Sequence, residues 1–157
     1  MTGAPVLLPD VVLPTLQGET AALRDPTASA RLVVLYRHDC DVCRVVLPVI
    51  ERVTRAFHGK KLLTLGVSLS DADATLDVIN EHGLCFPQAL DADRVVERAL
   101  AVEQVPTIVL ADADGLVVAR CAGLDAAALT DVLIAAARLS GADEGEVRRA
   151  IEAFKLG

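Results

Sequence analysis

The sequence predicts an α/β domain in which helices cover both faces of one central β-sheet. Residues 31–36 and 61–69 are continuous apolar runs, typical of strands buried on both faces of a sheet. The segment between them has helical spacing, and residues 105–123 predict a hairpin that leads into a long helix. The element order is therefore β-α-β, an α-β-α insertion, and β-β-α, which is that of an α/β fold.

The length and composition indicate one domain with an aliphatic core. The chain has 157 residues, 53% of them hydrophobic, with no Trp and one Tyr. A chain of this length buries enough surface to fold without cross-links. We assign residues 1–140 to the domain, with an N-terminal extension of about residues 1–30, and residues 141–157 to a short helix or tail.

The first predicted helix, residues 43–57, joins the two buried strands in a right-handed β-α-β unit. Its apolar residues follow the helical period, and its charged residues lie mostly on the opposite side. The apolar positions are Val46, Leu47, Ile50, Val53 and Phe57, and the charged ones are Arg44, Glu51, Arg52 and Arg55.

The insertion is predicted from helix-capping signals on either side of a short strand. Ser70, followed by the acidic Asp71 and Asp73, marks the start of a helix that ends near Gly83, and residues 85–90 form a strand. Asp91 then caps a helix that runs to Leu100.

The C-terminal part is predicted as a hairpin followed by helices. The two strands meet in a turn at residues 112–115, and Asp125 caps a long amphipathic helix. Residues 142–157 predict one more short helix or a tail.

The charge and the opening segment exclude several classes of function. A net charge of −7 with scattered Lys and Arg disfavours binding to nucleic acid or anionic membranes. The opening segment has no basic stretch and contains Pro5, Pro9 and Pro14, so it predicts neither a signal peptide nor a transmembrane helix. We expect a cytoplasmic protein as written, or an extracytoplasmic one if an export signal has been removed.

Cys40 and Cys43 have the spacing and position of a redox pair. They lie between the first buried strand and its helix, where ligands and chemistry gather in open α/β sheets. The free N–H groups and the dipole of a helix N-terminus stabilise a thiolate, which Cys40 is placed to become. Cys43, one turn further, can attack a mixed disulfide formed at Cys40.

These features together resemble the TlpA/ResA branch of thioredoxin-fold thiol-disulfide oxidoreductases, which is related to the AhpC/TSA proteins. The matching motifs are Cys-Asp-Val-Cys after a buried strand, Pro48 within the helix, Val-Pro-Thr at residues 105–107, and Asp-Ala-Asp-Gly at the hairpin turn. The opening segment and the insertion are also typical of that branch. The resemblance covers roughly residues 8–140.

The resemblance implies a thioredoxin fold with a mixed sheet and thiol-disulfide oxidoreductase activity. Cys40 would be the nucleophile and Cys43 the resolving thiol, and Pro106 would follow a cis bond that exposes the backbone of Val105 to a partner peptide. Thr107 completes this substrate-binding segment. The partners would be protein thiols and disulfides and a thioredoxin-type electron donor, with no cofactor and no metal.

Three positions depart from the pattern of the resembled proteins. Asp39 stands where a tryptophan is usual, and Val46 and Val34 replace the two acidic residues that commonly carry protons in these folds. The substitutes available for the deprotonation of Cys43 are His38, Asp39 and Glu103.

His38, Asp39 and Asp41 are expected to adjust the acidity of the Cys40 thiol. The two carboxylates flank Cys40 and disfavour a thiolate, whereas a protonated His38 would favour it. Strong oxidants of this fold depend on a stabilised thiolate. We therefore expect a reductant, or a near-neutral exchanger, of partner disulfides.

Four other interpretations of the cysteines are weaker. A zinc site needs about four ligands and this motif supplies two, and a four-residue disulfide loop gives little entropic stabilisation. A peroxiredoxin-like thiol peroxidase usually has a Pro-Thr loop before its cysteine, which is absent before Cys40. A non-catalytic redox-sensing or binding module is supported by the missing proton carriers. Cys85 and Cys121 are expected to be buried, inert thiols.

Overall fold

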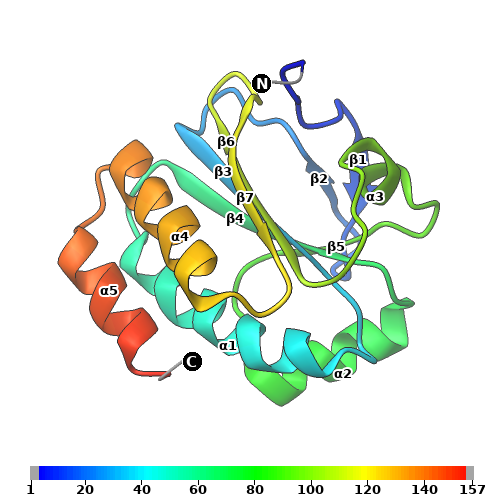
Figure 1. Ribbon diagram of the computed structural model, residues 1–157. Coiled ribbons are helices and arrows are strands. Elements are labelled where there is room, and N and C mark those ends of the chain that lie inside the picture. Colours follow the sequence, from blue (N-terminus) through cyan, green and yellow to red (C-terminus); the bar gives the residue numbers. More distant parts are fainter. Residues whose placement is uncertain (1–3, 155–157) are drawn as a thin grey trace.

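The computed structural model describes residues 4–154 and shows a five-stranded mixed sheet with helices on both faces (Figure 1). The strand order is β5-β4-β3-β6-β7. In this sheet β3, β4 and β5 are parallel to one another, whereas β6 is antiparallel to β3 and β7 is antiparallel to β6. The strands are β3 (Ala30–Tyr36), β4 (Leu62–Ser68), β5 (Gln88–Leu90), β6 (Thr107–Asp112) and β7 (Val117–Ala122). The predicted fold class is confirmed.

Different elements cover the two faces of the sheet. One face carries α1 (Asp41–Ala56), α2 (Ala72–His82), α4 (Ala126–Ser140) and α5 (Glu144–Glu152). The other face carries α3 (Val95–Ala99) and the hairpin of β1 (Val12–Pro14) and β2 (Thr20–Ala22). The N-terminal extension therefore covers the face that lacks long helices.

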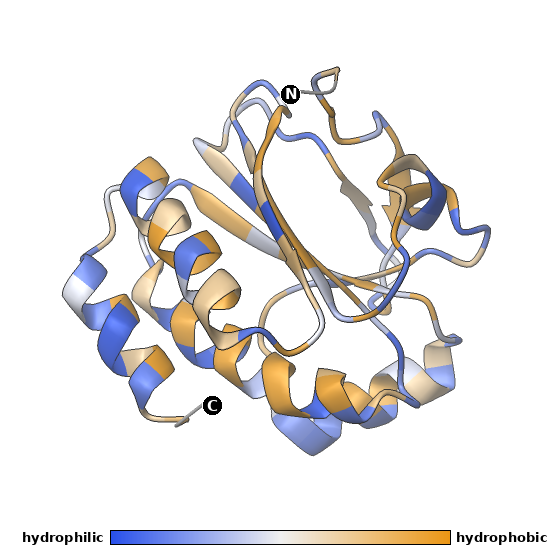
Figure 2. Ribbon diagram, viewed as in Figure 1, coloured by the Kyte–Doolittle hydropathy of each residue, from blue (hydrophilic) through white to orange (hydrophobic). Residues whose placement is uncertain are grey.

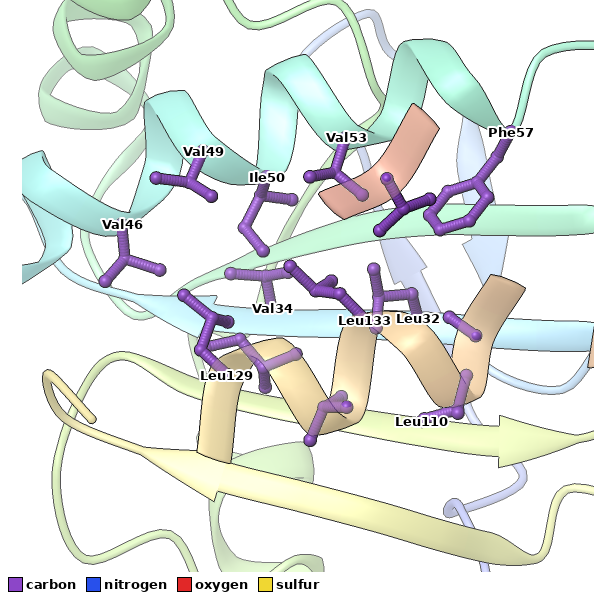
Figure 3. Close-up of a cluster of buried hydrophobic side chains, with 14 of the residues drawn as sticks. Leu32, Val34, Val46, Val49, Ile50, Val53, Phe57, Leu110, Leu129 and Leu133 are labelled. Carbon is purple, nitrogen blue, oxygen red and sulfur yellow. The ribbon is translucent and has the colours of Figure 1, made fainter. Parts of the chain in front are cut away.

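β3 is buried on both sides, which explains its uninterrupted apolar sequence. Leu32 and Val34 belong to the cluster that packs against α1 and α4, shown in Figure 3, whereas Val33 and Leu35 belong to the cluster beneath the β1–β2 hairpin. All seven residues of β3 are buried. Figure 2 shows the same pattern, with apolar colours along the central strands and hydrophilic colours on the sides of the helices that face away from the sheet.

Some boundaries differ from the prediction for local reasons. α1 begins at Asp41 because Cys40 is its N-cap. The strand predicted over residues 85–90 is shorter, and only Gln88–Leu90 pairs with β4. α3 begins late because Arg94 has a left-handed backbone (φ 57°). The Asp91 carboxylate still accepts N–H bonds from Val96 and Glu97, at 3.2 and 3.0 Å.

α5 is a helix that packs against both α1 and α4. The Asp143 carboxylate caps it by accepting N–H bonds from Gly145 and Glu146, at 2.7 and 3.2 Å. Its buried side chains are Val147, Ala150 and Ile151, which join the α1–α4 core. Residues 1–3 of the predicted extension and 155–157 of the predicted tail lie outside the described residues.

No helix within residues 4–154 combines the length and the apolar character needed to cross a bilayer.

Candidate active site

Cys40 lies at the junction of β3 and α1 and caps the helix with its own sulfur. Its backbone is extended (φ −121°, ψ 110°), and its Sγ accepts the N–H of Cys43 at 3.0 Å. Its side chain is half-buried, so a partner sulfur can reach it. The cap supplies the stabilising helix N–H that the sequence predicts for this position.

Cys43 is buried one turn into α1, with only 1% of its surface exposed. Burial, and then its hydrogen bond with Cys40, hold the pKa of the Cys43 thiol far above its usual range, while the backbone N–H and the charge of Arg37 act in the opposite direction. Both cysteines are free thiols in this structure. The pair therefore consists of one accessible sulfur and one covered sulfur.

The segment 105–107 lies next to Cys40. The Cys40 thiol lies 3.6 Å from the carbonyl oxygen of Val105, to which it donates, and the Val105–Pro106 peptide bond is cis. Pro106 and Thr107 are buried, and Thr107 Oγ1 donates to the carbonyl of Gln104 at 2.7 Å. The N–H of Val105 makes no hydrogen bond within residues 4–154. The segment thus presents an open backbone group beside the accessible sulfur.

The charged residues around Cys40 point to solvent rather than to the sulfurs. Asp39 and Asp41 are exposed, and Asp39 Oδ1 lies 3.7 Å from the guanidinium of Arg37. The ring of His38 is held by Ser70, with Nδ1 2.7 Å from its Oγ. The backbone N–H of His38 donates to the same hydroxyl at 3.0 Å. The ion pair of Asp39 and the hydrogen bond of the His38 ring are therefore made with groups other than the two sulfurs.

The residues at the usual proton-carrier positions form an apolar wall. Val34 and Val46 are fully buried in the same cluster as Cys43. Glu103 is exposed and borders a cavity of about 30 Å³ together with Arg37 and Val105. This cavity places a carboxylate and a guanidinium beside Val105.

A buried polar network lies behind the dithiol, and the sequence analysis missed it. Tyr36 donates its hydroxyl hydrogen bond to Gln88 Oε1 at 2.8 Å, and the hydroxyls of Ser68 and Thr75 lie 2.6 Å apart. Burial raises the pKa of Tyr36, Ser68 lowers it, and the charge of Cys43 raises it again. The signal was available in the single tyrosine and in a glutamine within an apolar strand.

The expectation for the remaining cysteines is wrong at Cys85. Its side chain is exposed because residues 85–87 form a loop before β5 rather than a paired strand. The buried carboxylate of Glu51 holds this loop by accepting the N–H of Cys85 at 2.6 Å. Glu51 therefore does not lie on the polar face of α1. Cys121, on β7, is buried, and both thiols are free.

Within residues 4–154, no three His, Cys, Asp or Glu side chains are grouped closely enough to hold a metal ion. The chemistry that the site can perform is that of two sulfurs. An accessible thiol at a helix N-terminus can attack a disulfide, and the buried thiol one turn away can attack the product.

The comparisons with known proteins agree with this geometry. The sequence profile described as the AhpC/TSA family matches residues 6–120. The thiol-disulfide oxidoreductase ResA of Bacillus thuringiensis (strain Al Hakam) is 25% identical over 116 residues, which are 73% of this chain and 67% of that protein.

Two solved structures share the fold. A candidate thiol:disulfide interchange protein DsbE of Chlorobium tepidum superposes with a TM-score of 0.76 at 24% identity, over 87% of this chain and 99% of that chain. A secreted disulfide oxidoreductase of Mycobacterium tuberculosis, homologous to DsbE of E. coli, superposes with a TM-score of 0.65 at 19% identity, over 89% and 96% of the two chains.

Proposed function

The chain belongs to the AhpC/TSA family, and from this premise we propose that it is a thiol-disulfide oxidoreductase in which Cys40 is the nucleophile and Cys43 the resolving thiol. One observation carries the assignment of roles. The sulfur of Cys40 is half-buried and accepts a helix N–H, whereas Cys43 is covered. Only the sulfur of Cys40 is accessible to a disulfide of another protein.

The reaction takes place in two exchanges. The Cys40 thiolate attacks a partner disulfide, so that a Cys40–partner bond forms, the partner's S–S bond breaks, and one partner thiolate leaves. Cys43 then loses its proton and attacks the Cys40 sulfur. The Cys40–Cys43 disulfide forms and the second partner thiolate leaves. The partner disulfide gains two electrons, and the Cys40–Cys43 dithiol loses two.

Within residues 4–154, no acidic or basic side chain forms a hydrogen bond with the Cys43 thiol that could carry its proton away. The surrounding positions Val34 and Val46 are apolar, and the side chains of His38 and Asp39 interact elsewhere. We infer that this proton is lost to solvent before the attack, because no side chain in the described part of the chain is placed to accept it. The charge and backbone N–H of Arg37 favour the Cys43 thiolate during this step.

Partner recognition is proposed to use the backbone of Val105. Its unpaired N–H lies beside Cys40, and an extended peptide can pair with such a group as a strand pairs with a sheet edge. Arg37 and Glu103 border this segment and would contact the side chains of the peptide. The substrates are therefore disulfides in extended protein segments, with a thioredoxin-type donor returning the electrons.

The proposed direction is reduction, or near-neutral exchange. Asp39 and Asp41 add negative charge on either side of Cys40, which opposes the thiolate that a strong oxidant needs. Arg37 partly offsets Asp39 at 3.7 Å, so Asp41 has the larger effect.

Two single-sulfur variants test the roles. Cys43→Ser should accumulate a mixed disulfide at Cys40 with a disulfide-bonded substrate such as insulin, detected by mass spectrometry, because no thiol remains to resolve it. Cys40→Ser should accumulate none. Capture by Cys40→Ser alone would reverse the assignment. Cys121→Ser provides the matched control, since its thiol is also buried but lies on β7.

Two rival activities give different readouts. A thiol peroxidase would consume hydrogen peroxide faster than it reduces insulin, and a redox sensor would form the Cys40–Cys43 disulfide without accelerating insulin reduction. The missing proton carriers favour the sensor over the peroxidase as the second candidate. Accelerated insulin reduction that requires both cysteines would exclude the sensor.

We propose an extracytoplasmic location. The Mycobacterium tuberculosis structural relative is described as secreted, which supports this alternative over the cytoplasmic one. Fractionation of cells that express the complete coding sequence, followed by immunodetection, tests the compartment.

A further inference from the structure

Two cavities flank residues 85–87, away from the dithiol. They measure about 430 and 400 Å³ and share Arg31, Cys85, Phe86 and Pro87. They exist because β5 pairs with β4 only from Gly66 onward, so the first half of β4 has no strand beside it on that edge. The smaller of the two, which we call the hairpin cavity, also contacts the β1–β2 hairpin through Thr15, Thr20 and Ala21.

Arg31 places a buried positive charge at the hairpin cavity. Only 9% of its surface is exposed, and it forms no salt bridge with a carboxylate of residues 4–154. Its guanidinium donates to the backbone carbonyls of Ala22 and Leu23, the latter at 3.2 Å. Burial lowers the pKa of Arg31, and the charge of Asp25 raises it. The charge of Asp25, which makes no salt bridge with Arg31, only partly balances the buried guanidinium, and an anion in contact with it would lower the remaining cost.

A second polar group in the same cavity also lacks a partner. The hydroxyl oxygen of Thr15 is buried and makes no hydrogen bond within the described part of the chain. A buried hydroxyl normally has a partner, because desolvation without a hydrogen bond is unfavourable. Thr15 and Arg31 thus provide a hydroxyl and a guanidinium that line one space.

The rest of the lining is apolar or solvated, except for the buried Gln88, whose amide is already bonded to the Tyr36 hydroxyl and to the carbonyl of Phe86. Leu65, Ile79, Leu84, Phe86 and Pro87 provide an apolar wall. Glu19 also borders the cavity but is exposed, so its charge is screened by solvent. A cavity of this volume that combines an apolar wall with convergent polar groups is typical of a small-molecule site.

We propose that the hairpin cavity binds a small organic carboxylate, with its charged group at Arg31 and Thr15 and its apolar body against Leu65, Leu84 and Phe86. The site is separate from the dithiol and does not depend on the proposed exchange reaction. It fixes the hairpin to the open edge of the sheet when it is occupied.

Hexanoate is a suitable probe, with neutral hexanamide as its matched control. Titration followed by amide NMR shifts should move signals of residues 15–21 and 84–88 with hexanoate, and hexanamide should bind about tenfold or more weakly, because hydrogen bonds to a charged group contribute more. Equal binding of the two probes would overturn the proposal, as would shifts confined to residues 36–43.

Three variants locate the site. Arg31→Gln should weaken hexanoate binding by about tenfold or more. Arg120→Gln should not, although Arg120 also donates to a backbone carbonyl, that of Leu100 at 2.8 Å. If Arg31→Gln does not fold, Thr15→Val decides the question. It removes the hydroxyl at nearly constant volume and should weaken binding by about two- to tenfold, whereas unchanged affinity contradicts the proposal.

Cys85 provides an independent reporter because it lines the hairpin cavity and is exposed. In oxidised protein, with Cys40 and Cys43 joined and Cys121 buried, an alkylating reagent should modify Cys85 first. Hexanoate should slow this alkylation in the wild type and in Arg120→Gln but not in Arg31→Gln. If hexanoate does not slow the alkylation of Cys85 in the wild type, binding at this cavity is refuted. That result would say nothing about insulin reduction by the dithiol, which is measured separately.

Discussion

The Tyr36 hydroxyl donates a hydrogen bond to Gln88 at 2.8 Å and so connects the central strand β3 to the edge strand β5. The Gln88 side chain passes over Gly66 of β4, where a Cβ atom would collide with the Gln88 amide. The absence of a side chain at Gly66 is therefore what permits this link behind the dithiol.

Gly66→Ala should reduce the free energy of unfolding by about 1–3 kcal/mol, because the new methyl group displaces Gln88 from Tyr36. Urea denaturation of the reduced protein measures this loss. In a double-mutant cycle, Gln88→Ala should cost much less in the Gly66→Ala background than in the wild type. Additive costs would show that the two residues do not interact.

The resolving step should become faster with pH and show no plateau below about pH 9. The pKa of Cys43 is raised by burial, so its thiolate fraction increases about tenfold per pH unit throughout this range. Release of the second thionitrobenzoate after reaction with Ellman's reagent reports the step. A plateau near neutral pH would reveal a proton acceptor that the structure does not show.

Arg37→Gln should slow the same step by about two- to fivefold, since the guanidinium charge lowers the pKa of Cys43. The backbone N–H of residue 37 is retained in this variant, which limits the effect. Arg44→Gln is the matched control, because Arg44 is an exposed arginine of α1 whose partner is Glu81, at 3.8 Å. If both variants slow the step equally, the effect comes from the net charge of the protein and not from the position of Arg37 beside Cys43.

Asp41→Asn should make the Cys40–Cys43 couple more oxidising by up to about 20 mV, because removal of an exposed nearby charge is worth about 1 kcal/mol or less. Asp39→Asn should have a smaller effect, since Arg37 already offsets Asp39. Equilibration with glutathione and mass spectrometry gives the potentials. Asp131→Asn, on the exposed side of α4, should leave the potential unchanged.

Alkaline pH should destabilise the protein through Cys121. Burial and then the charge of Asp125 raise the pKa of this thiol to about 11. The pKa of Cys121 is higher in the folded than in the unfolded protein. The stability that its protonated thiol contributes is therefore fully present below about pH 9. It is lost toward pH 11, where the free energy of unfolding falls by about 1.4 kcal/mol per pH unit. Urea denaturation of oxidised protein tests this, and Cys121→Ala should flatten the profile. Asp125→Asn retains the α4 cap and should end the loss at a lower pH, so that the total loss of stability is smaller.

The sequence was sufficient for the features that depend on local pattern. The apolar run of β3 predicts burial on both faces, and the position of Cys40 after it predicts a cysteine at a helix N-terminus. Both hold because strand burial and helix capping depend on neighbouring residues. The hairpin of β6 and β7 follows in the same way from its turn residues.

Features that depend on tertiary pairing could not be predicted. Cys85 has the apolar neighbours of a buried residue, but its exposure depends on where β5 begins to pair with β4. Glu51 occupies a polar-looking helix position, yet it is buried because a backbone N–H from a distant loop needs an acceptor. The surroundings of His38 likewise depend on Ser70, which belongs to a different strand connection.

The packing of α5 on α1 also has a consequence for biosynthesis. The helix that carries the dithiol is made early, but Val147, Ala150 and Ile151, which complete the cluster that contains it, are translated much later. A nascent chain that has emerged only as far as Ser140 leaves part of this cluster open to water. During that interval the C-terminal half of α1, around Arg52, Arg55 and Ala56, has less cover than in the finished fold, and the emergence of residues 144–152 from the ribosome completes its enclosure.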